Sequence, residues 1–148
     1  MKKNIKRIAR ARKRKGQAML ESAMVLTAAI MLLVGTFDLG QIFFLHNSLV
    51  ERTRLTARYA ASNYGDTTAV TNYFLYGSPT QTPGITSTFM QVAPSMVSVT
   101  RYDANTNNDR MEVKVHDYPY QFITPYLSGI YTGKPIVATA PTETRDGW

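Results

Sequence analysis

The stretch AMVLTAAIMLLVGTF, Ala23–Phe37, decides the fold, because a helix of this sequence is apolar on every side. It lies within a longer run, Ser22–Leu45, whose 24 residues carry one formal charge, Asp38. As a helix this run spans about 36 Å, and a bilayer core is roughly 30 Å thick. The run therefore predicts a membrane-spanning helix.

A basic segment, Lys2–Lys15, precedes the apolar run. Residues 1–16 carry nine Lys or Arg and no acid, and the other 132 carry eight Lys or Arg and ten acids, so the net charge of +7 becomes 8 − 10 = −2 without the segment. Alone, such a run is typical of a disordered tail, a nucleic-acid-binding arm or a cytoplasmic flank. It has no interleaved aromatic residue, so we expect no nucleic-acid binding. By the positive-inside rule, Lys13, Arg14, Lys15 and the rest of the segment hold the N-terminus in the cytoplasm.

A secretory signal peptide is the nearest alternative to a membrane anchor. Its apolar core usually has 7–15 residues and ends at a small-residue cleavage site. Here the apolar pattern continues past Phe37 and no good A-x-A site closes it, which favours the anchor.

The helical pattern continues beyond the apolar run. Glu51 can pair with Arg54 three residues later, and Asn63–Gly65 is a typical stop signal. We therefore expect one helix from about Gln17 to Asn63, roughly 70 Å long. One face of its outer half is predicted to contain Ile42, His46, Leu49, Thr53, Ala57, Ala60 and Tyr64.

The remainder predicts a small mixed domain. Thr67–Tyr76 is expected to form a helical turn leading into an extended piece, and Gly77–Gly84 a loop. Met96–Asp103 and Asp109–Asp117 alternate in polarity around a turn-rich link, which is typical of a β-hairpin.

A third strand is expected at Ile136–Arg145, with Pro141 placing its far end at an edge or a bulge. The predicted fold class is α+β, a long N-terminal helix followed by an antiparallel sheet of about three strands. The predicted organisation is a basic leader at 1–16, a transmembrane half-helix at 17–45, an amphipathic extracytoplasmic half at 46–64 and a small extracytoplasmic domain at 65–148.

The side chains indicate no catalytic constellation. His46 and His116 have no partner nearby in sequence and are interpreted as structural. Asp103, Asp109 and Asp117 are spaced too widely for a calcium loop and are interpreted as solvated turn acids. There is no cysteine, so no thiol chemistry is available. We expect no enzyme activity, no cofactor and no metal site.

The head of the helix carries the strongest functional signal. A cut after Gly16 would make Gln17 the new N-terminus and would leave Glu21 one helical turn from a charged amine. In a filament, the amine of one chain can meet Glu21 of its neighbour. At about 4 Å and an effective dielectric near 20, the attraction is about 4 kcal/mol before the cost of desolvation.

A simpler interpretation of Glu21 stays open. A glutamate near a helix N-terminus interacts favourably with the helix dipole, and its side chain can reach the water at a membrane surface.

The stretch KGQAMLESA, Lys15–Ala23, resembles a type IV prepilin processing site and, more narrowly, that of the TadE-like minor pilins or pseudopilins of tight-adherence (Flp-type) systems. Three further segments are similar to that family in the same order. They are GTFDLG at Gly35–Gly40, RLTARYAA at Arg54–Ala61, and VKVHDYPY at Val113–Tyr120 followed by FITP at Phe122–Pro125, with a last strand ending at Thr144 and Arg145.

The resemblance implies a precursor in the bacterial inner membrane that a prepilin peptidase cuts between Gly16 and Gln17. Its other implied partners are pilin subunits and the pilus assembly machinery, and its implied roles are pilus assembly and adhesion. The sequence departs from the family pattern in having Ser22 where major pilins often have Tyr, and Gln17 where the broader class often has Phe. The first departure and the sizeable C-terminal domain favour a minor subunit.

Two other hypotheses remain at this stage. One is an uncleaved single-pass protein whose outer domain binds a ligand or the cell wall. The other is a hydrolase at the membrane surface, which lacks support because no paired acids or nucleophile–base set stand out.

Overall fold

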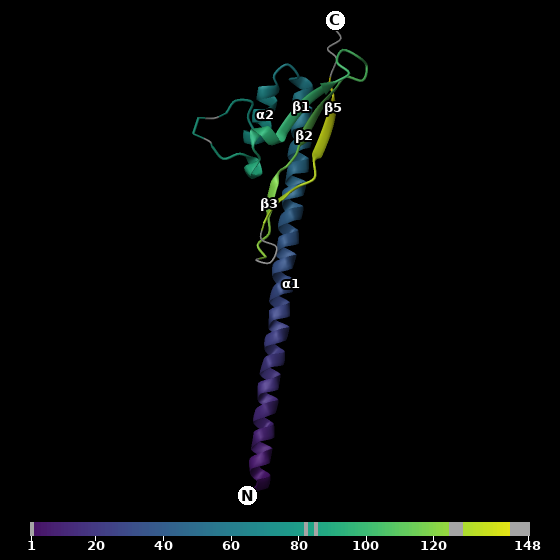
Figure 1. Ribbon diagram of the computed structural model, residues 1–148. Coiled ribbons are helices and arrows are strands. Elements are labelled where there is room, and N and C mark those ends of the chain that lie inside the picture. The colour runs from purple at the N-terminus through teal and green to yellow at the C-terminus, as the bar shows by residue number, and fades with distance from the viewer. Residues whose placement is uncertain (1, 82, 85, 125–128, 143–148) are drawn as a thin grey trace. The chain divides into compact units, whose positions relative to one another are not determined.

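The structure is a computed structural model that describes residues 2–81, 83–84, 86–124 and 129–142, with side chains from residue 16 onward except that of Ile130. Within these residues, two α-helices, two 3-10 turns and five strands follow one another (Figure 1). In order they are α1 (Lys2–Ser62), α2 (Thr67–Tyr76), η1 (Phe89–Gln91), η2 (Pro94–Met96), β1 (Val97–Tyr102), β2 (Arg110–Val115), β3 (Pro119–Gln121), β4 (Ile130–Thr132) and β5 (Ile136–Pro141). The predicted α+β class is confirmed.

Helix α1 begins earlier than the sequence analysis predicted. It starts at Lys2 rather than near Gln17, because the basic segment has no proline and is rich in Lys, Arg and Ala, which favour helix. It ends at Ser62, one residue before the expected Asn63. The chain divides into two compact units, Met1–Gly40 and Gln41–Trp148.

In the first unit, α1 leaves its large apolar side chains exposed. Met19, Leu20 and Leu32 are 76%, 65% and 74% exposed. Each hydroxyl of Ser22 and Thr27 donates to the carbonyl four residues earlier, at 2.9 and 2.8 Å, so these polar groups are satisfied within the helix. By length and composition, the segment that starts at Gly16 can cross a membrane.

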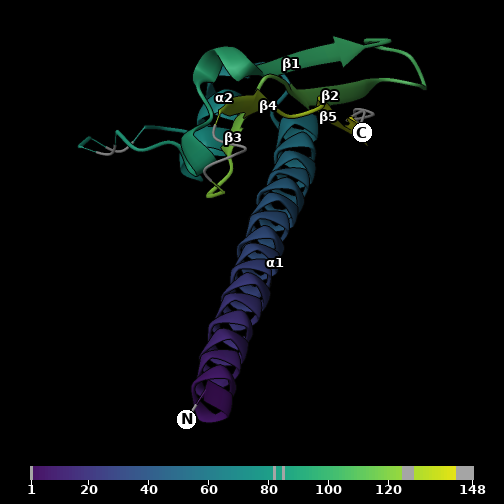
Figure 2. The same ribbon diagram turned by 60° about the horizontal axis from the view of Figure 1, so that its bottom comes forward.

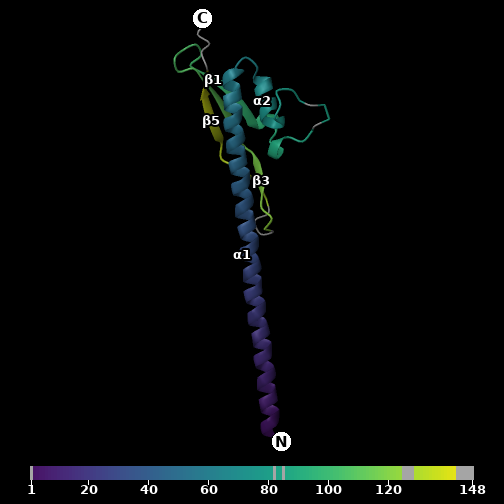
Figure 3. The same ribbon diagram turned by 180° about the vertical axis from the view of Figure 1, so that it is seen from behind.

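In the second unit, a three-stranded antiparallel sheet has the order β1-β2-β5, with β2 in the centre. Alternate residues of β2, Met111, Val113 and Val115, are buried on one face. They share a core with Leu49 of α1 and Phe74 of α2. Figures 1 and 3 show the last turns of α1 lying along this sheet, and Figure 2 shows the same sheet from a tilted direction.

The predicted hairpin and third strand are present. β1 and β2 pair with Val97 opposite Val115, and Pro141 ends β5, an edge strand, where proline removes no ladder hydrogen bond. The expected strand end at Thr144 and Arg145 lies outside the described residues.

The prediction for Thr67–Tyr76 was wrong in part, since the whole segment is the helix α2. The carboxylate of Asp66 accepts a hydrogen bond from the backbone N–H of Ala69 at 2.9 Å, which caps the start. Gly77 adopts a left-handed conformation (φ 78°) and its N–H donates to the carbonyl of Tyr73, which closes the end. Both capping residues flank the segment, which fixes it as helix.

Two further features differ from the sequence prediction. A second, two-stranded sheet, β3–β4, forms where no strand was expected. The buried face of α1 includes Thr56 and Ala61, whereas His46 and Tyr64 are exposed. Tyr64 lies beyond the end of the helix, so the helical spacing no longer applies to it.

Candidate functional site: the head of helix α1

The predicted processing residues lie on one regular stretch of α1. Gly16, Gln17 and Glu21 are all exposed, and the helix is unbroken through them. Gln17 and Glu21 are four residues apart and share a helix face, about 6 Å apart along the axis. The backbone of 13–15, which carries the topology residues Lys13, Arg14 and Lys15, continues the same helix.

Gly16 has no packing reason to be glycine. A Cβ atom added there would meet nothing within 4 Å. A glycine inside a helix costs about 0.5–1 kcal/mol relative to alanine. Folding of this helix therefore disfavours the residue that stands at the predicted cleavage site.

Glu21 has no hydrogen-bond or ion-pair partner among the side chains that the structure describes. It borders a shallow depression on the helix surface, whose other lining residues are Ala18, Ser22, Val25, Leu26 and Ala29. Small side chains such as Ala18 and Ser22, four residues apart, allow a second helix to approach closely. The one acid within the apolar run, Asp38, differs from Glu21 because its side chain is buried.

The prediction that neither histidine has a partner nearby in sequence was wrong for His116, which contacts the next residue, Asp117, whereas the partner of His46 is distant in sequence. Nδ1 of His46 lies 3.4 Å from the hydroxyl of Tyr118, and Nδ1 of His116 lies 2.8 Å from a carboxylate oxygen of Asp117. Burial raises the pKa of Tyr118. Within the described residues, no group of three or more His, Cys, Asp or Glu side chains could hold a metal ion.

The interpretation of Asp109 as a solvated acid was wrong, whereas Asp103 and Asp117 are exposed as expected. Asp109 is 4% exposed and accepts hydrogen bonds from Nε (2.9 Å) and Nη2 of Arg101 and from the backbone N–H of Asn105 (3.0 Å). The hydrogen bond from Arg101 is the main cause that lowers the pKa of Asp109 well below its usual value. This two-point contact between the guanidinium of Arg101 and the carboxylate of Asp109 stabilises the end of the β1–β2 hairpin.

Sequence reasoning also missed the position of Arg52. Its Nε donates to the carbonyl of Phe74 at 2.9 Å, and its guanidinium lies 5.1 Å from the ring centre of Phe89 and 5.7 Å from that of Tyr73. The sequence held a signal for this contact. The last carbonyls of a helix favour a nearby cation, and α2 has no basic residue in its own last turn. Arg52 of α1 supplies that cation.

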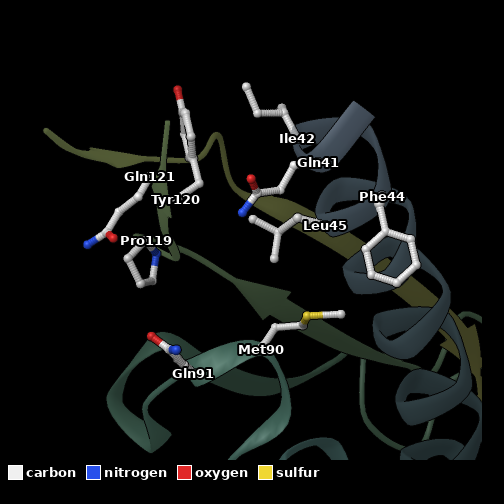
Figure 4. A pocket seen from close by; sticks show the side chains of 9 residues that line it. All are labelled: Gln41, Ile42, Phe44, Leu45, Met90, Gln91, Pro119, Tyr120 and Gln121. Atoms are coloured by element: carbon white, nitrogen blue, oxygen red, sulfur yellow. The ribbon is translucent and has the colours of Figure 1, made fainter. Parts of the chain in front are cut away.

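A pocket of about 440 Å³ lies within the second unit. Figure 4 shows Gln41 and Leu45 of α1 facing Tyr120 of β3 across it, with Met90 on a third side. Met90 and its neighbour Gln91 both have positive φ angles, 51° and 60°, which are uncommon for residues other than glycine. Apolar side chains and the amides of Gln41, Gln91 and Gln121 line the pocket.

Residues 16–58, which run from the predicted cleavage site into the outer half of α1, match the family model of the TadE-like protein. The match confirms the family resemblance over these residues and supports involvement in a tight-adherence pilus system, and the similarity of the segments after residue 58 stays a prediction. No curated protein and no solved structure matches the chain.

Proposed function

We propose that the chain, which matches the TadE-like family over residues 16–58, is a minor pilin or pseudopilin subunit of a tight-adherence pilus. A prepilin peptidase cuts the precursor between Gly16 and Gln17 in the bacterial inner membrane, where α1 crosses once with its N-terminus in the cytoplasm. The mature subunit then works with other pilin subunits and the assembly machinery in pilus formation or adhesion, and enters a surface pilus.

One observation carries the proposal. Glu21 is an exposed acid with no partner among the described side chains, and it lies five residues after a glycine that folding disfavours. Cutting after Gly16 creates the missing cation, the amine of Gln17. A neighbouring helix that approaches over Ala18 and Ser22 brings its own amine near Glu21, which makes assembly favourable only after cleavage.

A test of the processing step is Gly16→Ala. Alanine strengthens the helix, so a folding role predicts an unchanged or more stable protein, whereas a processing role predicts loss of cleavage. We expect the precursor to accumulate as an unshifted band on a gel. The matched control is Gly35→Ala, which makes the same change in the same helix with equally open space around the added atom. Normal maturation of the Gly16 variant would refute the cleavage site.

The pocket favours a second candidate function. An uncleaved single-pass protein could use the cavity near Tyr120 to bind a ligand or the cell wall. A native N-terminus at Met1 or Lys2 would support this candidate over the pilin.

A further inference from the structure

The ribbon formed by β3 and β4 carries aromatic side chains that the core does not use. Tyr120 lies 5.6 Å from Tyr131 between ring centres, and Phe122 lies 5.1 Å from Tyr131. Tyr131 is 38% exposed and the adjacent Ile123 is 63% exposed. A ribbon of two strands is only marginally stable alone in water. Burial of these partly exposed rings against a further apolar surface would therefore stabilise it.

The ribbon is uncharged between charged ends. Tyr118–Gly133 has no Asp, Glu, Lys or Arg, and Asp117 and Lys134 flank it. Residues 67–100 are also uncharged, but their loop Gly77–Gly84 consists of Gly, Ser, Pro, Thr and Gln. Tyrosine rings combine an apolar body with a polar tip, which suits the headgroup level of a membrane.

The ribbon lies beside the part of α1 where the apolar run ends. Gln41 and Leu45 share the pocket with Tyr120, as Figure 4 shows. Phe43 and Phe44, in the same turns, are 64% and 65% exposed. These residues form the outer end of the predicted membrane-spanning run, so the ribbon is at the level where α1 would leave the bilayer.

We propose that the β3–β4 ribbon and the adjoining turns of α1 form a second membrane contact. The rings of the ribbon and Ile123 lie in the headgroup region of the outer leaflet, and the pocket receives lipid. The amide of Gln41 supplies a polar group for lipid esters, and none of the lining residues that the structure describes is charged. The proposal rests on the membrane-spanning role of α1 in the proposed function.

The test uses single-tryptophan reporters in the full chain, with Trp148, the one native tryptophan, replaced in Trp148→Phe. Ile123→Trp reports on the ribbon and Leu32→Trp, at a site 74% exposed, on the helix. Tyr102→Trp, on the edge strand β1, is the matched control in the second unit. Each is placed in lipid nanodiscs that hold one chain, with and without lipids brominated near the headgroup or deep in the acyl chains.

We expect shallow bromines to remove most of the Ile123→Trp emission and deep bromines most of the Leu32→Trp emission, with Tyr102→Trp unaffected. Full Ile123→Trp emission beside a quenched Leu32→Trp would overturn the ribbon contact and leave the spanning helix intact. If neither is quenched, the membrane role of α1 fails and the ribbon contact fails with it. An Ile123→Trp signal that changes only in assembled pili would mean a protein contact instead. Because Ile123 is exposed, its substitution leaves the fold intact, and Phe122→Trp provides a second reporter.

Discussion

Glu21 and Asp109 are two acids in opposite environments. Asp109, in the second unit, is buried and accepts hydrogen bonds from the guanidinium of Arg101. Glu21, in the first unit, is exposed in an apolar stretch and lacks a partner among the described side chains. Within the described residues of 41–148, the buried Asp109 is therefore satisfied internally, whereas the pairing of Glu21 with a charge from another chain remains part of the proposal.

The apolar side chains show the same contrast. In the second unit Leu49, Phe74 and Val113 are fully buried together. In the first unit Met19 and Leu32 stay exposed. The described part of the second unit buries these side chains within the single chain, whereas the first unit leaves them exposed, as is typical of a membrane-spanning helix.

The largest effect is expected at Glu21. In Glu21→Ala, incorporation into pili should fall roughly tenfold or more, since each 1.4 kcal/mol is a factor of ten and the pairing of two charges supplies several. Cleavage and membrane insertion should be retained. Immunoblots of sheared pili against total membrane protein measure the ratio.

The control for Glu21 is Glu51→Ala. Glu51 lies on the same helix and pairs with Arg54 at 3.1 Å on an exposed surface, as the sequence predicted. Its loss should leave incorporation unchanged. Equal incorporation of the two variants would remove the pairing role of Glu21.

A smaller effect, on stability alone, is expected at Asp109. Asp109→Asn removes the carboxylate that pairs with the guanidinium of Arg101. Because this leaves the charge of Arg101 unpaired, the urea midpoint of the second unit should fall. The measurement is pulse proteolysis of the full chain in detergent micelles. The exposed pair of Asp103 and Arg110, 2.9 Å apart, gives the control Asp103→Asn, which should change the free energy of unfolding by about 0–1 kcal/mol.

The same pair of variants tests a pH dependence. Because the folded pKa of Asp109 is lowered, its stabilisation is complete above the unfolded pKa of about 3.9 and is lost as the pH falls below that value. The urea midpoint of the wild type should therefore drop more steeply below about pH 4 than that of Asp109→Asn. Parallel curves would contradict the assignment.

The smallest effect is expected at Arg52, which joins α1 to α2. Arg52→Lys loses the Nε hydrogen bond to Phe74 and the stacking on Phe89, and should lower the free energy of unfolding by roughly 1–2 kcal/mol. Arg54→Lys is the matched control, since Arg54 is exposed. An unchanged urea midpoint for Arg52→Lys would show that the contact contributes nothing.

Much of the fold could be predicted because its signals are local. Alternating polarity marks Val97–Tyr102 and Arg110–Val115, and an apolar run marks the long helix. The helix α2 could have been predicted too, since Asp66 and Gly77 flank it with capping residues.

The missed features depend on contacts between distant residues. The strands β3 and β4 have three residues each, β3 begins with Pro119, and Pro135 follows soon after β4, so their pairing is not visible in either segment alone. Burial of Asp109 follows from the position of Arg101 across the hairpin, and Arg52 meets Phe74 from another helix. The candidate site at Gly16, Gln17 and Glu21 stays a prediction from its motif, to which the structure adds the open space around Gly16.

The most direct test is N-terminal mass spectrometry of the native protein from membranes and sheared pili. We expect a chain that begins at Gln17 in both fractions. A native chain that keeps the basic segment and begins at Met1 or Lys2 would contradict it, because the amine that Glu21 requires would never form.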